Sequence, residues 1–185
     1  MATVILSLML AAAAALVWIY NGLIQLQNRV RNGWQQIDVQ LKRRHDLIPN
    51  LVDTVKGAMQ FERDTLERVM TARARAVAAS GVHETAAAEA ALSQSLGRLL
   101  AVMENYPVLR ANENILQLQE ELTTTENQIA FARQFYNDTV MQFNTRQQVF
   151  PANQIAGFFG FTPAEYFRAA DDDRATPGVD LSLPR

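Results

Sequence analysis

Histidine and carboxylate side chains are the residues of this sequence that could do chemistry. The 185-residue chain has two histidines, His45 and His83, and no cysteine. A di-metal centre in a helical bundle needs Glu-x-x-His motifs, but Lys42 and Ser80 stand three residues before the histidines. The lack of cysteine excludes thiolate zinc sites, iron–sulfur clusters and cysteine nucleophiles. The sequence therefore predicts no catalytic residue, no metal site and no cofactor, and a protein that is not an enzyme.

The densest polar cluster is the run Arg43-Arg44-His45-Asp46, just before Pro49. One interpretation is a site for an anionic partner, such as a lipid headgroup or an acidic helix. The favoured one is an ion-pair network to Glu120, Glu121 or Glu126, because two arginines are too few for a polybasic patch. His45 itself is expected to be exposed or to cap a helix. The predicted helix-register or partner cluster comprises Arg43, Arg44, Asp46, Asn50, Glu126 and Arg133.

The composition favours a folded helical protein. Hydrophobic residues make up 49% of the chain, which is enough for a core, while Gly (8) and Pro (6) are scarce. The formal net charge is −2. Because nucleic-acid binders are normally basic, no nucleic-acid partner is expected.

An apolar segment near the N-terminus has the length of a membrane span. No charged residue occurs from Val4 to Tyr20, and about 20 helical residues cross the roughly 30 Å of a bilayer core. Trp18 and Tyr20 stand near its end, where aromatic rings favour the headgroup layer. A cleaved signal peptide is the alternative, with Ala11–Ala15 as the cleavage region, but no Lys or Arg precedes the segment. We therefore expect a retained anchor that contacts the lipid bilayer.

The charges that flank this segment predict its orientation. Arg29 and Arg31 follow it, and no basic residue precedes it. The positive-inside rule then places the N-terminus outside and the body in the cytoplasm, as a single-pass protein of the cell inner (plasma) membrane.

The remaining chain has helical periodicity and predicts an all-α fold. Apolar steps of three, four and seven indicate a long first helix that continues from the anchor to Ser80, with a kink favoured over a break at Pro49. Further helices are expected over 84–104 and 112–149, with a short fourth in the apolar stretch 155–167. We expect an antiparallel up-and-down bundle of three long helices and this short one. The predicted domains are an anchor (1–24), the bundle (25–168) and a flexible tail (169–185).

Aromatic residues are concentrated after Phe150. Phe158, Phe159 and Phe161 cannot all face one side of a short helix. This stretch is expected either to cap the core of the bundle, which is favoured, or to dock against a neighbour or lipid.

Several separated motifs together resemble the LemA family of bacterial membrane proteins. They are Trp34, Ile37-Asp38-Val39 and Leu41, the run 43–52 with 54–57, Glu67, Ala72-Arg73, Tyr106-Pro107, Glu126-Asn127, Ile129-Ala130, Ala132-Arg133, Tyr136-Asn137, Phe150-Pro151, Gly160-Phe161 and Tyr166-Phe167. A departure is Ala58, where the family often has an aromatic residue. The resemblance implies an N-terminal anchor, an outside N-terminus and a cytoplasmic helical bundle, and it implies no known reaction.

The leading functional hypothesis is a membrane-anchored scaffold or assembly protein that acts through coiled-coil-like self-association as a homo-oligomer. Ala11 and Ala15 form a small-xxx-small pair that would let anchor helices approach. The alternative is an adaptor or sensor that modulates a membrane protein partner, with the bundle as a switch at Pro49.

Overall fold

A computed structural model describes residues 1–168 of the chain, and the predicted flexible tail lies outside them. Within these residues the chain forms helices and no strand, which confirms the all-α prediction. The helices are α1 (Ala2–Val55), α2 (Arg63–Ala78), α3 (Val82–Met103), α4 (Pro107–Arg110), α5 (Glu113–Gln148) and α6 (Ala152–Phe159).

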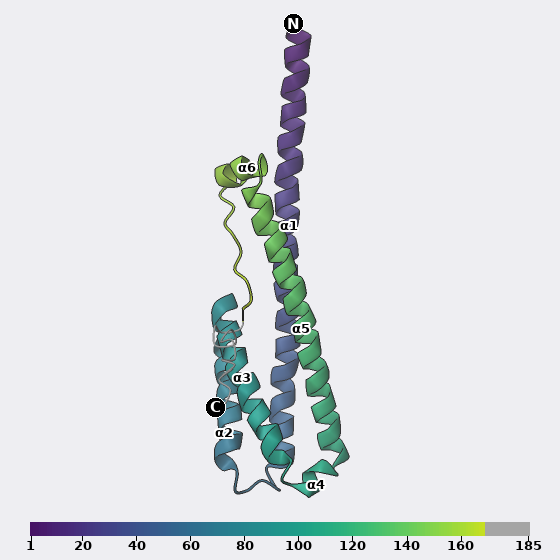
Figure 1. The fold of residues 1–185 in the computed structure, drawn as a ribbon, viewed down its shortest axis with the longest axis vertical. Helices are drawn as coiled ribbons and strands as arrows, with labels where there is room; N and C mark the ends of the chain where they lie inside the picture. The colour runs from purple at the N-terminus through teal and green to yellow at the C-terminus, as the bar shows by residue number, and fades with distance from the viewer. Residues whose placement is uncertain (169–185) are drawn as a thin grey trace, which may run out of the picture.

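Helix α1 is a single rod of 54 residues that passes through Pro49 without a break. Its N-terminal third stands clear of the other helices, and its remainder runs antiparallel to α5 (Figure 1). Asn112 begins α5 as an N-cap, because its side-chain oxygen accepts from the backbone N–H groups of Asn114 and Ile115. The two long helices approach closely at Gly33, where an added Cβ would lie 3.3 Å from the Cα atom of Tyr136.

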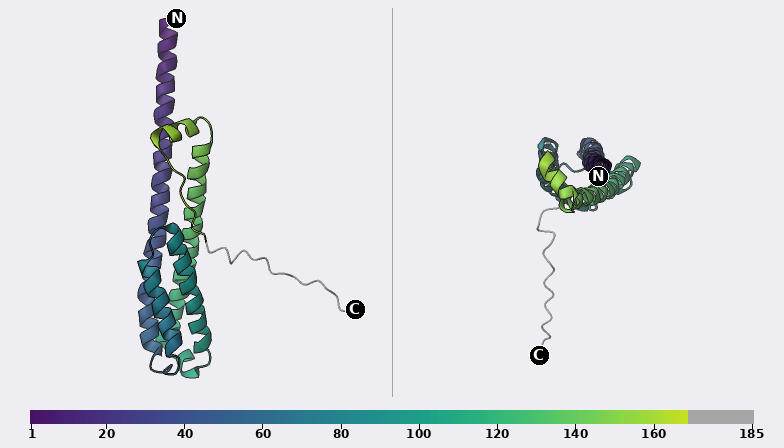
Figure 2. Two further views of the ribbon diagram at one scale, coloured as in Figure 1. Left: turned by 90° about the vertical axis from the view of Figure 1, so that its left-hand side faces the viewer. Right: turned by 90° about the horizontal axis from the view of Figure 1, so that it is seen from above.

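The prediction that the first helix continues to Ser80 is wrong. α1 ends at Val55, and a turn that contains Gly57 leads into α2, which folds back along α1 (Figure 2). Glycine is a poor helix former, and the reversal lets Leu66 and Val69 bury against α1 instead of projecting into water. The apolar repeat resumes in phase after the turn, so periodicity alone does not distinguish a hairpin from a continuous helix.

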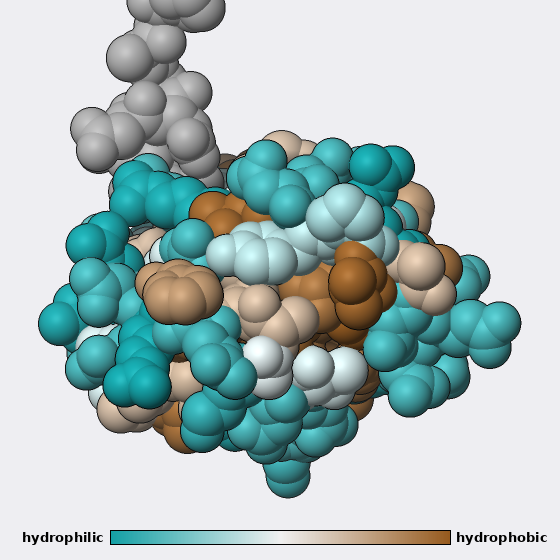
Figure 3. All heavy atoms as spheres, turned by 90° about the horizontal axis from the view of Figure 1, so that it is seen from below, coloured by the Kyte–Doolittle hydropathy of each residue, from teal (hydrophilic) through white to brown (hydrophobic). Residues whose placement is uncertain are grey.

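The half of the body distant from the N-terminus, here called the lower section, contains the hairpin of α2 and α3 packed on α1 and α5. Gly81, with a φ of 79°, forms the hairpin turn in a conformation that favours glycine. Seen from below, hydrophilic side chains ring a hydrophobic centre at this end of the molecule (Figure 3). The buried core of the section comprises Ile48, Leu51, Val52, Val55, Met59, Leu66, Val69, Ala72, Ala76, Leu92, Leu96, Leu99, Met103, Leu109, Ile115 and Leu122.

The half nearer the anchor, here called the upper section, contains parts of α1 and α5, a strap of residues 160–168 and the first turns of α3. Its core comprises Val30, Ile37, Leu41, Ala86, Ile129, Ala132, Tyr136, Val140, Phe143 and Phe167. The short helix expected within 155–167 is shifted, since α6 ends at Phe159. Gly160 stops it in the left-handed conformation (φ 73°), and the strap then runs back along α5 without regular structure.

Candidate functional site

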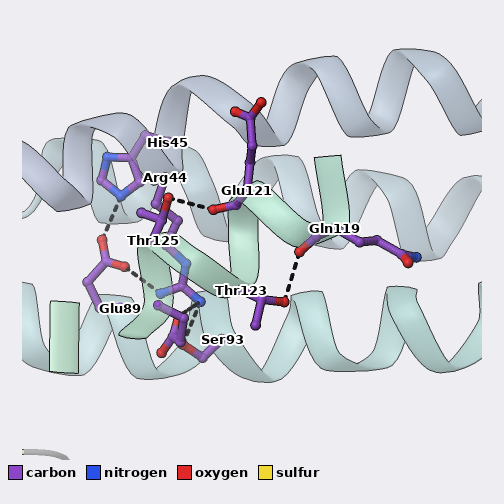
Figure 4. A network of polar contacts seen from close by, with 9 residues as sticks. Arg44, His45, Glu89, Ser93, Gln119, Glu121, Thr123 and Thr125 are labelled. Atoms are coloured by element: carbon purple, nitrogen blue, oxygen red, sulfur yellow. Dashed lines mark hydrogen bonds and ion pairs between the residues drawn. The ribbon is translucent and has the colours of Figure 1, made fainter. Parts of the chain in front are cut away.

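Arg44 of α1 is the centre of a polar network between three helices (Figure 4). Its side chain is buried, and one guanidinium nitrogen lies 3.2 Å from Oε2 of Glu89 on α3. The other nitrogen lies 2.9 Å from Oε2 of Glu126 on α5 and donates to the Ser93 hydroxyl at 2.8 Å. A buried arginine needs such partners because its desolvation is costly. The guanidinium therefore ties α1, α3 and α5 together.

His45 contributes a second contact to the same carboxylate. Its Nε2 lies 2.6 Å from Oε1 of Glu89. A carboxylate oxygen in this pair accepts, so Nε2 carries the hydrogen whether the ring is neutral or charged. The expectation of an exposed or capping histidine is wrong, because His45 is buried. It shares the inward face of α1 with Leu41 and Ile48, at helical steps of four and three.

Pro49 explains a further bond of this network. Proline has no N–H, so the carbonyl four residues earlier, that of His45, loses its helical partner. The Nε of Arg73 on α2 donates to this carbonyl oxygen at 2.6 Å. The helix continues through Pro49, and the freed carbonyl is the point at which Arg73 attaches α2 to α1.

The structure brings together only part of the predicted cluster. Arg44 and Glu126 meet, whereas Arg43, Asp46 and Asn50 are exposed on α1, away from the network. Arg133 lies in the upper section, where its guanidinium stacks 4.9 Å above the ring of Phe167.

Sequence reasoning missed Glu89, the residue that receives both Arg44 and His45. It lies in an alanine-rich stretch, and its position in the buried phase between Ala86 and Leu92 was the available signal. Among residues 1–168, no three His, Cys, Asp or Glu side chains are grouped so that they could hold a metal ion. The arrangement of one arginine, one histidine and two carboxylates is suited to joining helices.

Two asparagines of α5 bind the strap as a neighbouring strand would. Asn144 donates to the carbonyl of Ala164 at 2.9 Å and accepts from its N–H at 2.8 Å. Asn137 makes the same pair of bonds with Phe167, at 3.0 and 2.9 Å. The two side chains are seven residues apart and therefore share one face of α5. We call these two pairs of bonds the amide clamps.

The opposite side of the α1–α5 pair is uncovered in the upper section. Val39, Phe131 and Phe135 are 62%, 72% and 47% exposed there. Phe135 and Asn137 differ by about 200° around α5, so the clamped strap cannot also cover this side. The open face, as we call it, is a groove lined by Asn32, Gln35, Gln36, Val39, Gln40, Gln128, Phe131, Ala132 and Phe135.

The three singled-out phenylalanines have different environments. Phe161 packs inward, with ring centroids 6.4 Å from Phe143 and 6.0 Å from Tyr20. The ring of Phe159 lies 4.7 Å from that of Tyr20, yet 47% of Phe159 is exposed. Phe158 is 84% exposed.

The N-terminal part of α1 is long and apolar enough to cross a membrane, and it is the one such helix among residues 1–168. Only 6% of its most apolar window is buried inside the protein, so it is not a core helix. Such a surface requires an apolar environment, which a bilayer supplies. The protein is therefore membrane-associated.

The chain is similar in sequence to proteins of two organisms. The chain is 24% identical to magnetosome protein MamQ 2 of Paramagnetospirillum magneticum over 202 residues, which cover 94% of this chain and 74% of that protein. It is 27% identical to protein LemA of Metamycoplasma hominis over 164 residues, which cover 88% of this chain and 74% of that one. Neither name is that of an enzyme. The profile of the LemA family matches residues 33–181, and the chain belongs to the LemA family.

Proposed function

We propose that this protein is a non-enzymatic, membrane-anchored scaffold whose copies associate side by side through the open face. The observation that carries the proposal is the groove between α1 and α5, in which Val39, Phe131 and Phe135 are solvent-exposed. A pair of packed helices leaves part of the apolar stripe of each helix exposed to water unless a further layer covers it. The strap supplies this layer on one side, and a second copy would supply it on the other.

The chemistry of the open face suits contact with itself. Every residue that lines the groove is uncharged. In a two-fold interface the same patch meets its own copy, so a charged lining would place like charges together.

The anchor restricts how the copies can meet. Chains that share one membrane stand parallel, so the two-fold axis lies along the membrane normal. Residue 131 of one copy then faces residue 131 of the other.

Disulfide formation in membranes tests the proposal, since the natural chain has no cysteine. Full-length Phe131→Cys should form a covalent dimer on mild oxidation. The control Ala74→Cys, on an exposed position of α2, should stay monomeric. An adduct at position 131 with a foreign protein alone would favour the adaptor hypothesis, and equal dimer yields at 131 and 74 would refute a specific interface.

The orientation proposed for this scaffold has the N-terminus outside and the body in the cytoplasm, at the inner membrane. Its support is the position of Arg29 and Arg31 after the apolar segment, both with exposed side chains. Protease added to spheroplasts should leave the body intact. Digestion of the body before lysis would show that the body lies outside. This result would contradict the proposed orientation but not the proposed contact through the open face.

A further inference from the structure

Helix α6 lies against α1 at the point where α1 leaves the body (Figure 1). Ala152 and Ala156 of α6 are buried against Ile19 and Leu23 of α1. These two alanines are one helical turn apart, so they define the inward side of α6. The helix is therefore held at the end of the anchor by a small apolar contact.

The length of the anchor places this contact at the edge of the bilayer. The exposed run from Ala2 to Trp18 rises about 25 Å, whereas a bilayer core is about 30 Å thick. The near edge of the core then falls about one helical turn beyond Trp18, beside Ile19 and Leu23. Arg146 lies 5.7 Å above the ring of Trp18, so a cationic side chain and an indole ring meet close to this edge.

The segment around α6 has the composition of a membrane contact. Residues 149–164 include no charged side chain. Phe150 and Phe158 are 78% and 84% exposed, although most phenylalanines bury their rings. Several exposed aromatic rings in one uncharged segment would be an aggregation hazard in water.

We propose that α6 is a second membrane contact, which lies in the interface of the bilayer that the anchor spans and inserts Phe150 and Phe158 at the boundary of headgroups and acyl chains. Amphipathic helices lie in this layer with their apolar face about 5–10 Å deep. Lipid is the occupant favoured by position, because any surface beside Ile19 and Leu23 lies at headgroup level. The open face is centred farther along α1, at Val39. The lack of charge predicts binding that does not depend on anionic lipid.

Spin-label accessibility in full-length protein tests this contact. Phe158→Cys with a nitroxide label is reconstituted in phosphatidylcholine vesicles at high lipid excess. We expect the label to be several-fold less accessible to a water-soluble nickel complex, and more accessible to oxygen, than a label at Phe61→Cys. Phe61 is 96% exposed in the turn between α1 and α2, at the other end of the body, and is the matched control. Leu8→Cys in the anchor gives the reference for a buried depth.

A label at position 158 that is as accessible to nickel as one at 61 would overturn the proposal. Protection of the label at position 158 from nickel could also disappear when the protein is diluted with more lipid. This result would overturn the proposal, because it indicates contact with another protein molecule. Equal depth in vesicles with and without phosphatidylglycerol would support an uncharged contact. Phe150→Cys provides an independent second position.

Discussion

The lower and upper sections of the body cover the apolar faces of α1 and α5 in different ways. In the lower section α2 and α3 fold onto α1 and α5, so four helices enclose one core. In the upper section the same two long helices are covered by the strap and, at the lower edge, by the first residues of α3. The lower section is therefore closed by the chain itself, whereas the upper section keeps an apolar face on the side opposite the strap.

Buried and exposed apolar side chains should respond differently to substitution. Fully buried side chains lie in both sections, such as Leu51 in the lower one and Ile37 in the upper one. The exposed Val39, Phe131 and Phe135 belong to the upper section. Substitutions in the first group should unfold the protein, and substitutions in the second should leave it folded but change what it contacts.

Loss of the Arg44 side chain should give the largest decrease in the free energy of unfolding. Arg44→Ala leaves Glu89 buried without its arginine and loosens α3 from α1, which makes the lower section resemble the two-helix upper section. Removal of one partner of a buried ion pair costs about 3–5 kcal/mol. We expect a loss of this size in the free energy of unfolding, measured by denaturant titration of the full-length protein in detergent.

The double variant Arg44→Met/Glu89→Leu is the control for this experiment. It removes both charges together, so part of the stability should return, although the buried Nε2 of His45 loses its acceptor. Arg43→Ala, on the exposed side of the same helix, should change the free energy of unfolding by less than about 0.5 kcal/mol. Equal losses at 43 and 44 would contradict the role given to the network.

Removal of an amide clamp should have an intermediate effect that is confined to the upper section. Asn137→Ala deletes both bonds to Phe167, and two net hydrogen bonds are worth about 1–3 kcal/mol. Hydrogen exchange should accelerate at the Phe167 amide and remain slow in α2 and α3. Asn127→Ala, an exposed amide on α5, is the matched control and should leave exchange in the strap unchanged.

Alkaline pH should give the smallest decrease in the free energy of unfolding. Burial, followed by the nearby Glu165 carboxylate, raises the pKa of the Tyr136 phenol above its ordinary 10.0. Above pH 10 the unfolded chain then loses this proton more readily than the folded one, so stability falls as the pH rises. Tyr136→Phe lacks the bond to the Glu165 carbonyl, made at 2.8 Å, and should be about 1 kcal/mol less stable at neutral pH. Its stability should also depend less on pH above 10, as measured by thermal unfolding.

The sequence predicted the helices but not how the first one ends. The apolar repeats identified α3 and α5 to within a few residues, because side-chain burial on one face directly produces the periodicity. The turn at Gly57 was missed, since α2 continues the repeat in phase. Pro49 was correctly placed inside the first helix. The bond from Arg73 to the freed His45 carbonyl was not predicted, because no local pattern specifies a contact between distant segments.

The polar cluster was harder to predict for the same reason. Arg44 and Glu126 were named from their charge, yet charge alone does not distinguish Arg44 from Arg43, which faces water one residue earlier. The helical phase decides which of the two is buried. The amide clamps depend on backbone groups of the strap, whose extended course follows from tertiary contacts with α5.

We expect the continuity of α1 to carry any tilt of the anchor into the body. A membrane span changes its tilt when the thickness of the hydrocarbon core around it changes. The roughly 35 residues of α1 beyond the bilayer edge measure about 50 Å, so a tilt of about 10° would displace the far tip by about 9 Å. Since α1 has no break at the membrane edge, this displacement reaches the lower section mechanically, without any change in its packing.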